Sequence, residues 1–142
     1  MPIEKAELLA MIAAAIGQRE NAHAPYSNFS VGAAVLAGSG KVYLGCNVEN
    51  ASYGLTVCAE RVAILRAISD GEREIRAVVV CAGEDEPAPP CGACLQVMAE
   101  FAPKDEPLTI VTCSPDGTYT QATLADYLPM PFTLRRQPPS FT

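Results

Sequence analysis

Residues 58–82, CAERVAILRAISDGEREIRAVVVCA, contain a helical pattern that is followed directly by a strand-like run. Apolar residues after Cys58 recur at helical spacing as far as Ile68. Asp70-Gly71 then places a glycine where a helix C-terminal cap is expected. The short apolar run from Ile75 to Ala82 is typical of a buried strand. This stretch therefore predicts a helix packed against a sheet.

The flanking sequence continues the alternation of helices and strands. Turn residues at Gly38-Ser39-Gly40 separate two strand-like runs and predict a hairpin. Strands are expected over about 30–37, 41–48, 75–82, 108–113 and 119–121, and helical segments over 3–21, 59–70, 91–101 and 123–128. This order predicts an α/β fold, a mixed sheet of about five strands covered by helices.

The length of 142 residues favours a single domain over residues 1–142, without repeats or linkers. Four prolines lie within residues 129–142, so this C-terminal tail is not expected to form regular structure. The N-terminus lacks the basic region of a signal peptide, and no apolar run approaches the ~18 residues of a membrane span. We therefore expect a cytoplasmic protein with no membrane contact.

The charge pattern argues against long nucleic acids as partners. The net charge is −6, and only Arg135 and Arg136 are adjacent cations. Binding a phosphate backbone requires a clustered positive face, which this sequence does not offer. A small, uncharged or weakly charged ligand fits the composition better.

Six cysteines occur in two kinds of context. Cys46, Cys81 and Cys113 lie within apolar strand-like runs, where free cysteines usually serve as small buried hydrophobes. By contrast, Cys58 and the Cys91/Cys94 pair stand where helices are predicted to begin. Helix N-termini carry partial positive charge and lower the pKa of a thiol, so these two sites present thiolates.

Three thiolates suit one zinc ion, because zinc is tetrahedral and accepts sulfur ligands. Cys58, Cys91 and Cys94 would leave a fourth position open, which is typical of a catalytic site. His23, the only histidine, lies near the end of the first predicted helix, and we interpret it as a solvated or loop-packing residue. A fourth ligand is therefore not evident, although a closed structural zinc module remains the alternative of a different class.

Glu60 stands two residues from a ligand and could reach a water on the open position. A carboxylate there can accept a proton from this water and return it to the substrate. Cys-x-Glu followed by Pro-Cys-x-x-Cys is the general signature of zinc deaminases. Because three thiolates give zinc a net charge of −1, compensation is required, and Arg61 is expected to donate to the thiolate sulfurs.

Taken together, the sequence resembles the short-chain, homotetrameric zinc-dependent cytidine deaminases over nearly its whole length. The matching blocks are Pro25-Tyr26-Ser27-Asn28-Phe29-Ser30-Val31-Gly32-Ala33-Ala34, Gly45-Cys46-Asn47-Val48-Glu49-Asn50-Ala51-Ser52-Tyr53, Cys58-Ala59-Glu60-Arg61, Pro90-Cys91-Gly92-Ala93-Cys94-Leu95-Gln96 and Leu128-Pro129-Met130-Pro131-Phe132. The resemblance implies a hydrolase that converts cytidine and 2′-deoxycytidine to uridine and 2′-deoxyuridine in pyrimidine salvage. It also implies one Zn²⁺ per subunit.

The resemblance assigns further roles around the substrate. Phe29 would stack on the pyrimidine ring, and the backbone of Ala59 would help to seat it. Asn47 and Glu49 would bind the ribose hydroxyls. Their spacing of two residues independently predicts that they point to one side of a strand. The residues expected to reach a neighbouring subunit's site, in a homotetramer, are Ala51, Tyr53 and Phe132.

Two positions depart from the family pattern. Leu95 stands where an arginine is usual, and Thr133 follows Phe132 where a glycine is usual. Both departures bear on the range of substrates more than on the reaction. An alternative is therefore a related deaminase that acts on a modified cytosine nucleoside, such as a nucleoside antibiotic. A deaminase that edits tRNA or DNA is disfavoured by the acidic balance and the three-cysteine ligand set.

Overall fold

The computed structural model describes residues 3–84 and 86–134. One five-stranded sheet has the order β2-β1-β3-β4-β5. Its strands are β1 (Val31–Ala37), β2 (Val42–Cys46), β3 (Ile75–Ala82), β4 (Thr109–Cys113) and β5 (Tyr119–Thr123). The predicted mixed sheet is confirmed, because β3 and β4 are parallel whereas the other neighbours are antiparallel.

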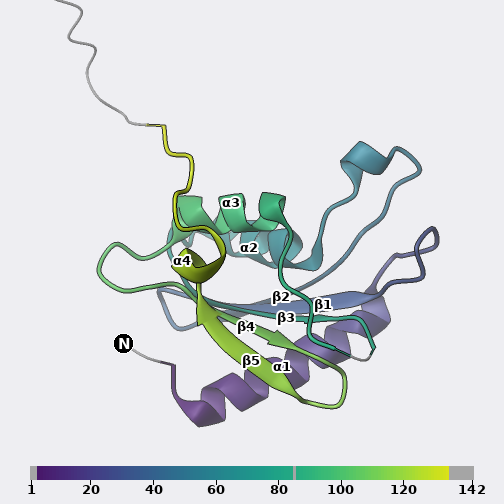
Figure 1. Ribbon diagram of the computed structural model, residues 1–142, viewed down its shortest axis with the longest axis horizontal. Helices are drawn as coiled ribbons and strands as arrows, with labels where there is room; N and C mark the ends of the chain where they lie inside the picture. Colours follow the sequence, from purple (N-terminus) through teal and green to yellow (C-terminus); the bar gives the residue numbers. More distant parts are fainter. Residues whose placement is uncertain (1–2, 85, 135–142) are drawn as a thin grey trace, which may run out of the picture.

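Helices cover both faces of the sheet (Figure 1). Helix α1 (Lys5–Gln18) lies on one face and packs its apolar side on β1 and β3. Helices α2 (Ala59–Ser69) and α3 (Gly92–Phe101) lie side by side on the opposite face, and α4 (Leu124–Tyr127) follows β5. A parallel strand pair needs a crossover connection, and the segment containing α3 provides the one between β3 and β4.

Glycine 45 sets how closely α2 approaches the sheet. A Cβ atom at this position would lie 2.5 Å from the Ala63 nitrogen and 2.6 Å from the Ala59 oxygen. Only glycine permits this backbone contact, which fixes the N-terminal half of α2 against β2. At the other end of the helix, Gly71 has φ +103° and donates its N–H to the Ile68 oxygen, which confirms the predicted C-terminal cap.

Most expected elements are present, with shifted ends. The first helix changes to a 3₁₀ turn, η1 (Arg19–Asn21), and a capping box between Thr123 and Asp126 begins α4. The second hairpin strand was predicted to reach residue 48 but ends at Cys46. Beyond that point Val48 forms isolated bridges with His23 and Val57. The pairing of β2 with β1 therefore ends at Cys46.

The predicted C-terminal tail lies only partly within the described residues. Residues 129–134 form neither helix nor strand, as expected from the prolines, and residues 135–142 lie outside the described part. In the described part of the chain, none of the helices combines the length and the apolarity that crossing a bilayer demands.

Candidate metal centre and active site

The thiols of Cys58, Cys91 and Cys94 meet between the N-termini of α2 and α3. Cys58 and Cys91 are the N-cap residues of these helices, as predicted, and Cys94 lies in the first turn of α3. Their sulfur atoms lie within 4.8 Å of one another. The Sγ–Sγ distances are 3.6 Å for Cys58–Cys91 and 3.4 Å for Cys91–Cys94. Across residues 3–84 and 86–134, no other such group of metal-ligating side chains occurs.

This geometry fits zinc. Zn–S bonds of about 2.3 Å in a tetrahedron place the sulfurs about 3.8 Å apart, close to the distances found here. The burial of the three side chains is graded: Cys94 is buried, Cys58 is half-buried and Cys91 is exposed. The thiol cluster therefore reaches the protein surface at Cys91.

Electrostatics favour ionised sulfur at Cys58. Its hydrogen bond with Cys94, together with contacts to Arg61 and Cys91, outweighs burial and lowers the pKa of Cys58 to about 5. The same hydrogen bond and burial raise the pKa of Cys94. Arg61 Nη2 lies 3.5 Å from Cys58 Sγ, and this contact raises the pKa of the guanidinium. The expected placement of Arg61 beside the sulfurs is confirmed.

Glu60 lies beside the thiols in the first turn of α2, with only 4% of its surface exposed. Burial, reinforced by the negative charge of Cys58, raises the pKa of its carboxyl. A carboxyl with a raised pKa holds a proton more readily than an ordinary one, as a group that returns a proton to a substrate needs. The role of Glu60 in proton transfer stays a prediction.

A cavity of about 400 Å³ joins the thiols to the predicted substrate-binding residues. Cys58, Glu60 and Cys91 line one end. The predicted residues Phe29, Asn47, Glu49 and Ala59 also line it, together with Ser27, Val31, Thr56, Val80, Ala82, Ala88 and Pro89. A larger hollow of about 660 Å³ lies on the outer side of α2, away from these groups. We assign the chemistry to the smaller cavity because it alone, of the two, contains the thiols and Glu60.

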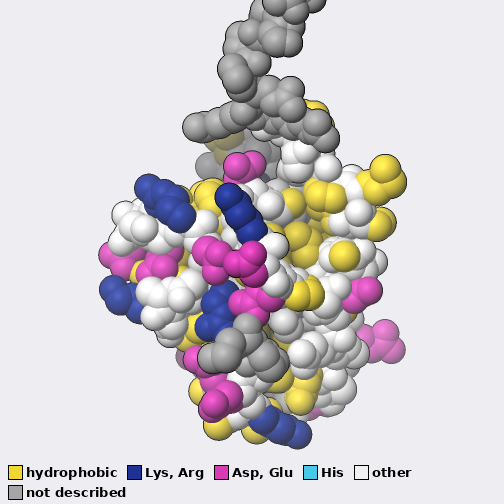
Figure 2. All heavy atoms as spheres, turned by 90° about the vertical axis from the view of Figure 1, so that its left-hand side faces the viewer, with side chains coloured by type: hydrophobic (Ala, Val, Ile, Leu, Met, Phe, Trp, Pro, Cys, Tyr) yellow, Lys and Arg dark blue, Asp and Glu magenta, His cyan; other side chains and the backbone are white. Residues whose placement is uncertain are grey.

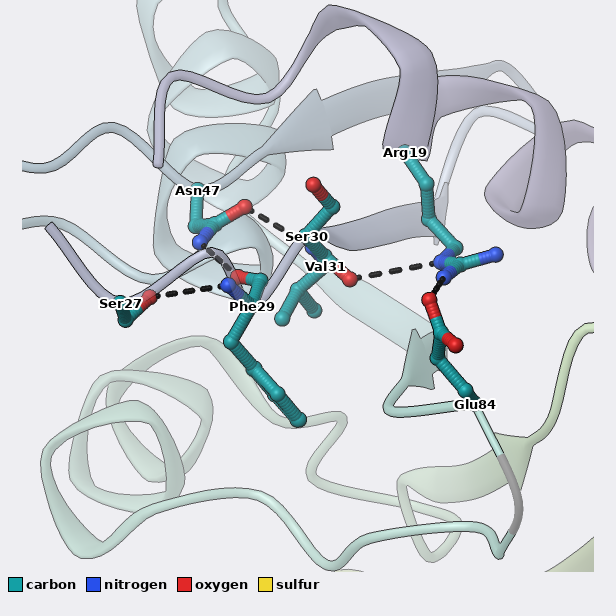
Figure 3. A network of polar contacts seen from close by, with 7 residues as sticks. All are labelled: Arg19, Ser27, Phe29, Ser30, Val31, Asn47 and Glu84. Atoms are coloured by element: carbon teal, nitrogen blue, oxygen red, sulfur yellow. Dashed lines mark hydrogen bonds and ion pairs between the residues drawn. The ribbon is translucent and has the colours of Figure 1, made fainter. Parts of the chain in front are cut away.

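The side chains of Asn47 (Figure 3) and Glu49 hold the loop that carries Phe29. Asn47 Nδ2 donates to the Phe29 oxygen at 2.8 Å, and its Oδ1 accepts from the Val31 nitrogen at 2.9 Å. Glu49 Oε1 accepts from the nitrogens of Tyr26 and Ser27, and its Oε2 accepts from the Ser27 hydroxyl. Both residues line one cavity, but they lie beyond the end of β2. Part of the hydrogen-bonding capacity of their side chains is used by this loop.

The three residues assigned to a neighbouring subunit's site are not among the residues that line the cavity of their own chain. Tyr53, in the 3₁₀ turn η2 (Tyr53–Leu55), is 79% exposed, and Phe132 is 72% exposed. Ala51 is also exposed. The segment with η2 projects from the body of the protein (Figure 1). Gln96 Nε2 on α3 donates to the Phe132 oxygen at 2.9 Å, which attaches the C-terminal segment to the helix of Cys94.

The remaining cysteines and His23 lie outside the thiol cluster. Cys81 and Cys113 are fully buried, as expected, but Cys46 is only half-buried. The three residues stand at or next to strand ends, rather than in mid-strand as predicted. His23 is exposed, and its backbone pairs with the segment of residues 47–49, which confirms its interpretation as a loop-packing residue. Of the two departures, Leu95 is in the core and Thr133 is exposed.

Two contributors to this site escaped the sequence-based interpretation. Ser27 lines the cavity and bonds to Glu49. Arg19 Nε donates to the Ser30 oxygen at 3.3 Å, and Arg19 also pairs with Glu84 at 3.9 Å, so it links the Phe29 loop to the segment before Cys91 (Figure 3). Ser27 belongs to a matched sequence block, which was the available signal, whereas the contacts of Arg19 depend on the tertiary fold.

Surface charge agrees with the expectation of a small ligand. Figure 2 shows one face on which Lys and Arg side chains lie among acidic ones, without a continuous basic surface. The cavity itself is lined by apolar and acidic groups more than by cations. This arrangement suits an uncharged ligand better than a phosphate backbone.

Comparison with known proteins agrees with this geometry. The family model described as "Cytidine and deoxycytidylate deaminase zinc-binding region" matches residues 5–109. The chain is 48% identical, over 87% of its length and 92% of the relative, to a cytidine deaminase of Halalkalibacterium halodurans. It is 44% identical to one of Sporosarcina psychrophila, over 94% of this chain and 93% of the relative.

A solved structure supports the same relationship. The crystal structure of cytidine deaminase from Burkholderia pseudomallei superposes with a TM-score of 0.81 and 44% identity, covering 92% of this chain and all of the other. These matches do not favour the alternative of a deaminase for a modified cytosine nucleoside. By its fold, its thiol cluster and these similarities, the chain belongs to the cytidine and deoxycytidylate deaminase family of zinc-binding hydrolases.

Proposed function

We propose that this protein deaminates cytidine and 2′-deoxycytidine by hydrolysis, which gives uridine or 2′-deoxyuridine and ammonia. The observation that carries the proposal is one cavity lined by Cys58 and Cys91 of the thiol cluster, by the buried Glu60 and by a pair of polar groups suited to a sugar. The relatives named cytidine deaminase, at 48% and 44% identity, support this choice of substrate.

One zinc ion per subunit is the proposed cofactor, held by Cys58, Cys91 and Cys94. When bound, zinc supplies a position at which water becomes a nucleophile near neutral pH. Arg61 offsets part of the negative charge of the three sulfurs, which otherwise makes that water less acidic. The N-termini of α2 and α3 contribute in the same direction, because their partial positive charge faces the sulfurs.

Glu60 is the proposed catalytic acid and base. Its carboxylate accepts a proton from the attacking water and delivers it to N3 of the pyrimidine ring. The oxygen adds at C4, and the C4–N4 bond then breaks. Glu60 transfers the remaining water proton to the leaving amino group, so that ammonia departs and a C4 carbonyl remains. The raised pKa of its carboxyl suits both transfers.

Phe29, Ala59, Asn47 and Glu49 are the proposed groups that hold the nucleoside. Phe29 stacks on the base, and the buried backbone of Ala59 seats it. Asn47 uses one amide N–H and one Oδ1 lone pair on the Phe29 loop, which leaves one donor and one acceptor for the sugar. Glu49 has about four acceptor positions, of which the loop occupies three. A ribose diol can therefore be bound by the capacity that remains.

The decisive experiment is Glu60→Gln. We expect this variant to retain zinc and to deaminate cytidine about 10²–10⁴-fold more slowly, because the amide cannot transfer protons. Release of ammonia and zinc content are measured on the same purified sample. Glu100→Gln, at an exposed position of α3, is the matched control and should retain full activity. Near-normal deamination by zinc-loaded Glu60→Gln refutes the role of Glu60.

We further propose a homotetramer in which sites are shared between subunits. The support is the exposure of Ala51, Tyr53 and Phe132, which lie in segments that leave the body of their own chain. Sedimentation equilibrium at the assay concentration should give about four times the chain mass of 15.0 kDa. A monomeric mass in a fully active sample contradicts the sharing of sites.

A cytoplasmic role in pyrimidine salvage is the remaining proposal. It rests on the similarity to proteins named cytidine deaminase. A host that requires pyrimidines and lacks its own deaminase should grow on cytidine when it expresses this protein. Failure to grow, despite active protein in the cell extract, contradicts the salvage role.

A further inference from the structure

We propose that Ser27 is a positioning residue that couples recognition of the sugar by Glu49 to stacking of the base on Phe29. The inference rests on the proposed function and deepens it. It assigns to one hydroxyl the task of holding two substrate-binding groups in a fixed relation to each other.

The Ser27 hydroxyl lies at a junction between these two residues. Its Oγ donates to Glu49 Oε2 and accepts from the Phe29 nitrogen, which lies 3.0 Å away. A hydroxyl has one donor hydrogen and two acceptor lone pairs, so it can make both bonds at once. The bond to an ionised carboxylate is the stronger of the two. Ser27 therefore connects Glu49 directly to the backbone of Phe29.

The backbone around Ser27 reinforces this link. The next residue, Asn28, has φ +58°, a left-handed conformation that turns the chain sharply between Ser27 and Phe29. Asn47 Nδ2 holds the Phe29 oxygen at 2.8 Å, so both backbone polar groups of Phe29 are bonded (Figure 3). The backbone from which the Phe29 ring projects is thus held by Ser27 at its nitrogen and by Asn47 at its oxygen.

Ser27 also determines which part of Glu49 can bind a ligand. The carboxylate accepts from the nitrogens of Tyr26 and Ser27 at Oε1, at 3.0 and 3.1 Å. The Ser27 hydroxyl occupies one side of Oε2. One acceptor position of about four is left, and its direction is set by the serine. These contacts also lower the pKa of Glu49, with the Ser27 hydroxyl as the largest cause.

Loss of this hydroxyl should therefore weaken the use of the sugar more than the use of the base. Without it, Oε2 is free to rotate, although both backbone bonds to Oε1 remain. The ribose hydroxyls then meet a carboxylate of less defined direction. A cytosine nucleoside without those hydroxyls has no diol to bind Glu49, whether in the unaltered protein or in Ser27→Ala. Its reaction should change only through Phe29.

The test compares cytidine with 2′,3′-dideoxycytidine, which lacks both hydroxyls of the diol. The ratio of their kcat/KM values measures how much the 2′ and 3′ hydroxyls contribute to binding and reaction. We expect Ser27→Ala to lower this ratio at least about tenfold, with most of the loss in KM for cytidine, because a hydrogen bond to a charged group is weakened. Ser27→Thr keeps a hydroxyl and should retain most of the ratio.

Controls separate positioning from a merely structural effect. Ser30→Ala removes a hydroxyl from the same loop, and that hydroxyl points away from the Phe29 ring (Figure 3), so the ratio should be unchanged. Ser27→Cys preserves the size of the side chain with a weaker donor, and serves if the alanine variant folds poorly. Circular dichroism and zinc content show which samples are intact.

The outcomes are distinct. If Ser27→Ala, or Ser27→Cys in its place, slows both nucleosides by the same factor, the ratio does not move and the coupling is refuted. If the unaltered protein does not deaminate cytidine, the proposed function fails before Ser27 is examined. A lowered ratio in Ser27→Ala, with retention in Ser27→Thr and Ser30→Ala, supports the inference.

Discussion

The cysteines of the thiol cluster and those of the sheet differ in environment rather than in chemistry. Cys58 ends a loop at the N-terminus of α2, beside Arg61, and its pKa is lowered to about 5, first through its hydrogen bond with Cys94. Cys113 lies fully buried at the end of β4, opposite Cys81. Burial, and then the nearby Cys81, raises the pKa of Cys113 to about 12.

This contrast shows what makes a thiol available to a metal. Cys81 and Cys113, the sheet pair, have apolar neighbours from α1, which favour the neutral thiol. In the cluster, the thiolate is favoured at Cys58, which lies at the N-terminus of α2 and in contact with the Arg61 guanidinium. Opposite faces of the same sheet therefore use the same side chain as a small hydrophobe and as a ligand.

The largest expected difference in zinc content and activity is between two alanine variants, one in the thiol cluster and one in the sheet pair. Cys91→Ala should lose zinc and lower cytidine deamination by roughly 10³-fold or more, because the metal and its water are both removed. Cys113→Ala should retain both properties and lose about 1–2 kcal/mol of unfolding free energy through the cavity it leaves. Metal analysis, activity and urea unfolding are measured on both variants.

The comparison fails if the two variants behave alike. Full zinc content in Cys91→Ala shows that this thiol is not a required ligand. Loss of zinc from folded Cys113→Ala shows that the sheet thiols also bind metal. Treatment of the unaltered protein with a chelator gives the reference, since it should reproduce the activity loss of Cys91→Ala without a substitution.

Local patterns predicted the thiol cluster well. A cysteine before a helical run becomes an N-cap, and two cysteines three residues apart share a helix face, so spacing placed Cys58, Cys91 and Cys94 on their helices. The Cys-x-Glu and Pro-Cys-x-x-Cys signature then predicted that they act as one set. The same local rules predicted the glycine cap at Gly71 and the five strands. Each of these features depends on residues that are close in sequence, whereas the approach of Cys58 to Cys91, 33 residues apart, depends on the fold.

The organisation of the cavity around Asn47 and Glu49 could not be predicted in this way. Spacing placed Asn47 and Glu49 on one side of a strand, but the strand ends at Cys46 and their side chains bond the Phe29 loop. Those contacts join residues about twenty positions apart, for example the 22 between Ser27 and Glu49. These contacts are determined only by how the β1–β2 hairpin packs against α1 and against the loop that carries Phe29.

The smaller expected effect concerns Arg61, which distinguishes the cluster from the sheet pair electrostatically. Arg61→Gln should keep most of its zinc and lose about 10–100-fold in kcat/KM, as for other groups that contact metal ligands. With one cation fewer near three thiolates, the acid limb of the pH–activity profile should move to higher pH. The matched control is Arg66→Gln, since Arg66 also lies on α2 but donates to the Leu44 oxygen at 2.6 Å. An unshifted profile in Arg61→Gln means that the guanidinium only packs against the sulfurs, and that the helix N-termini alone separate the two groups of cysteines.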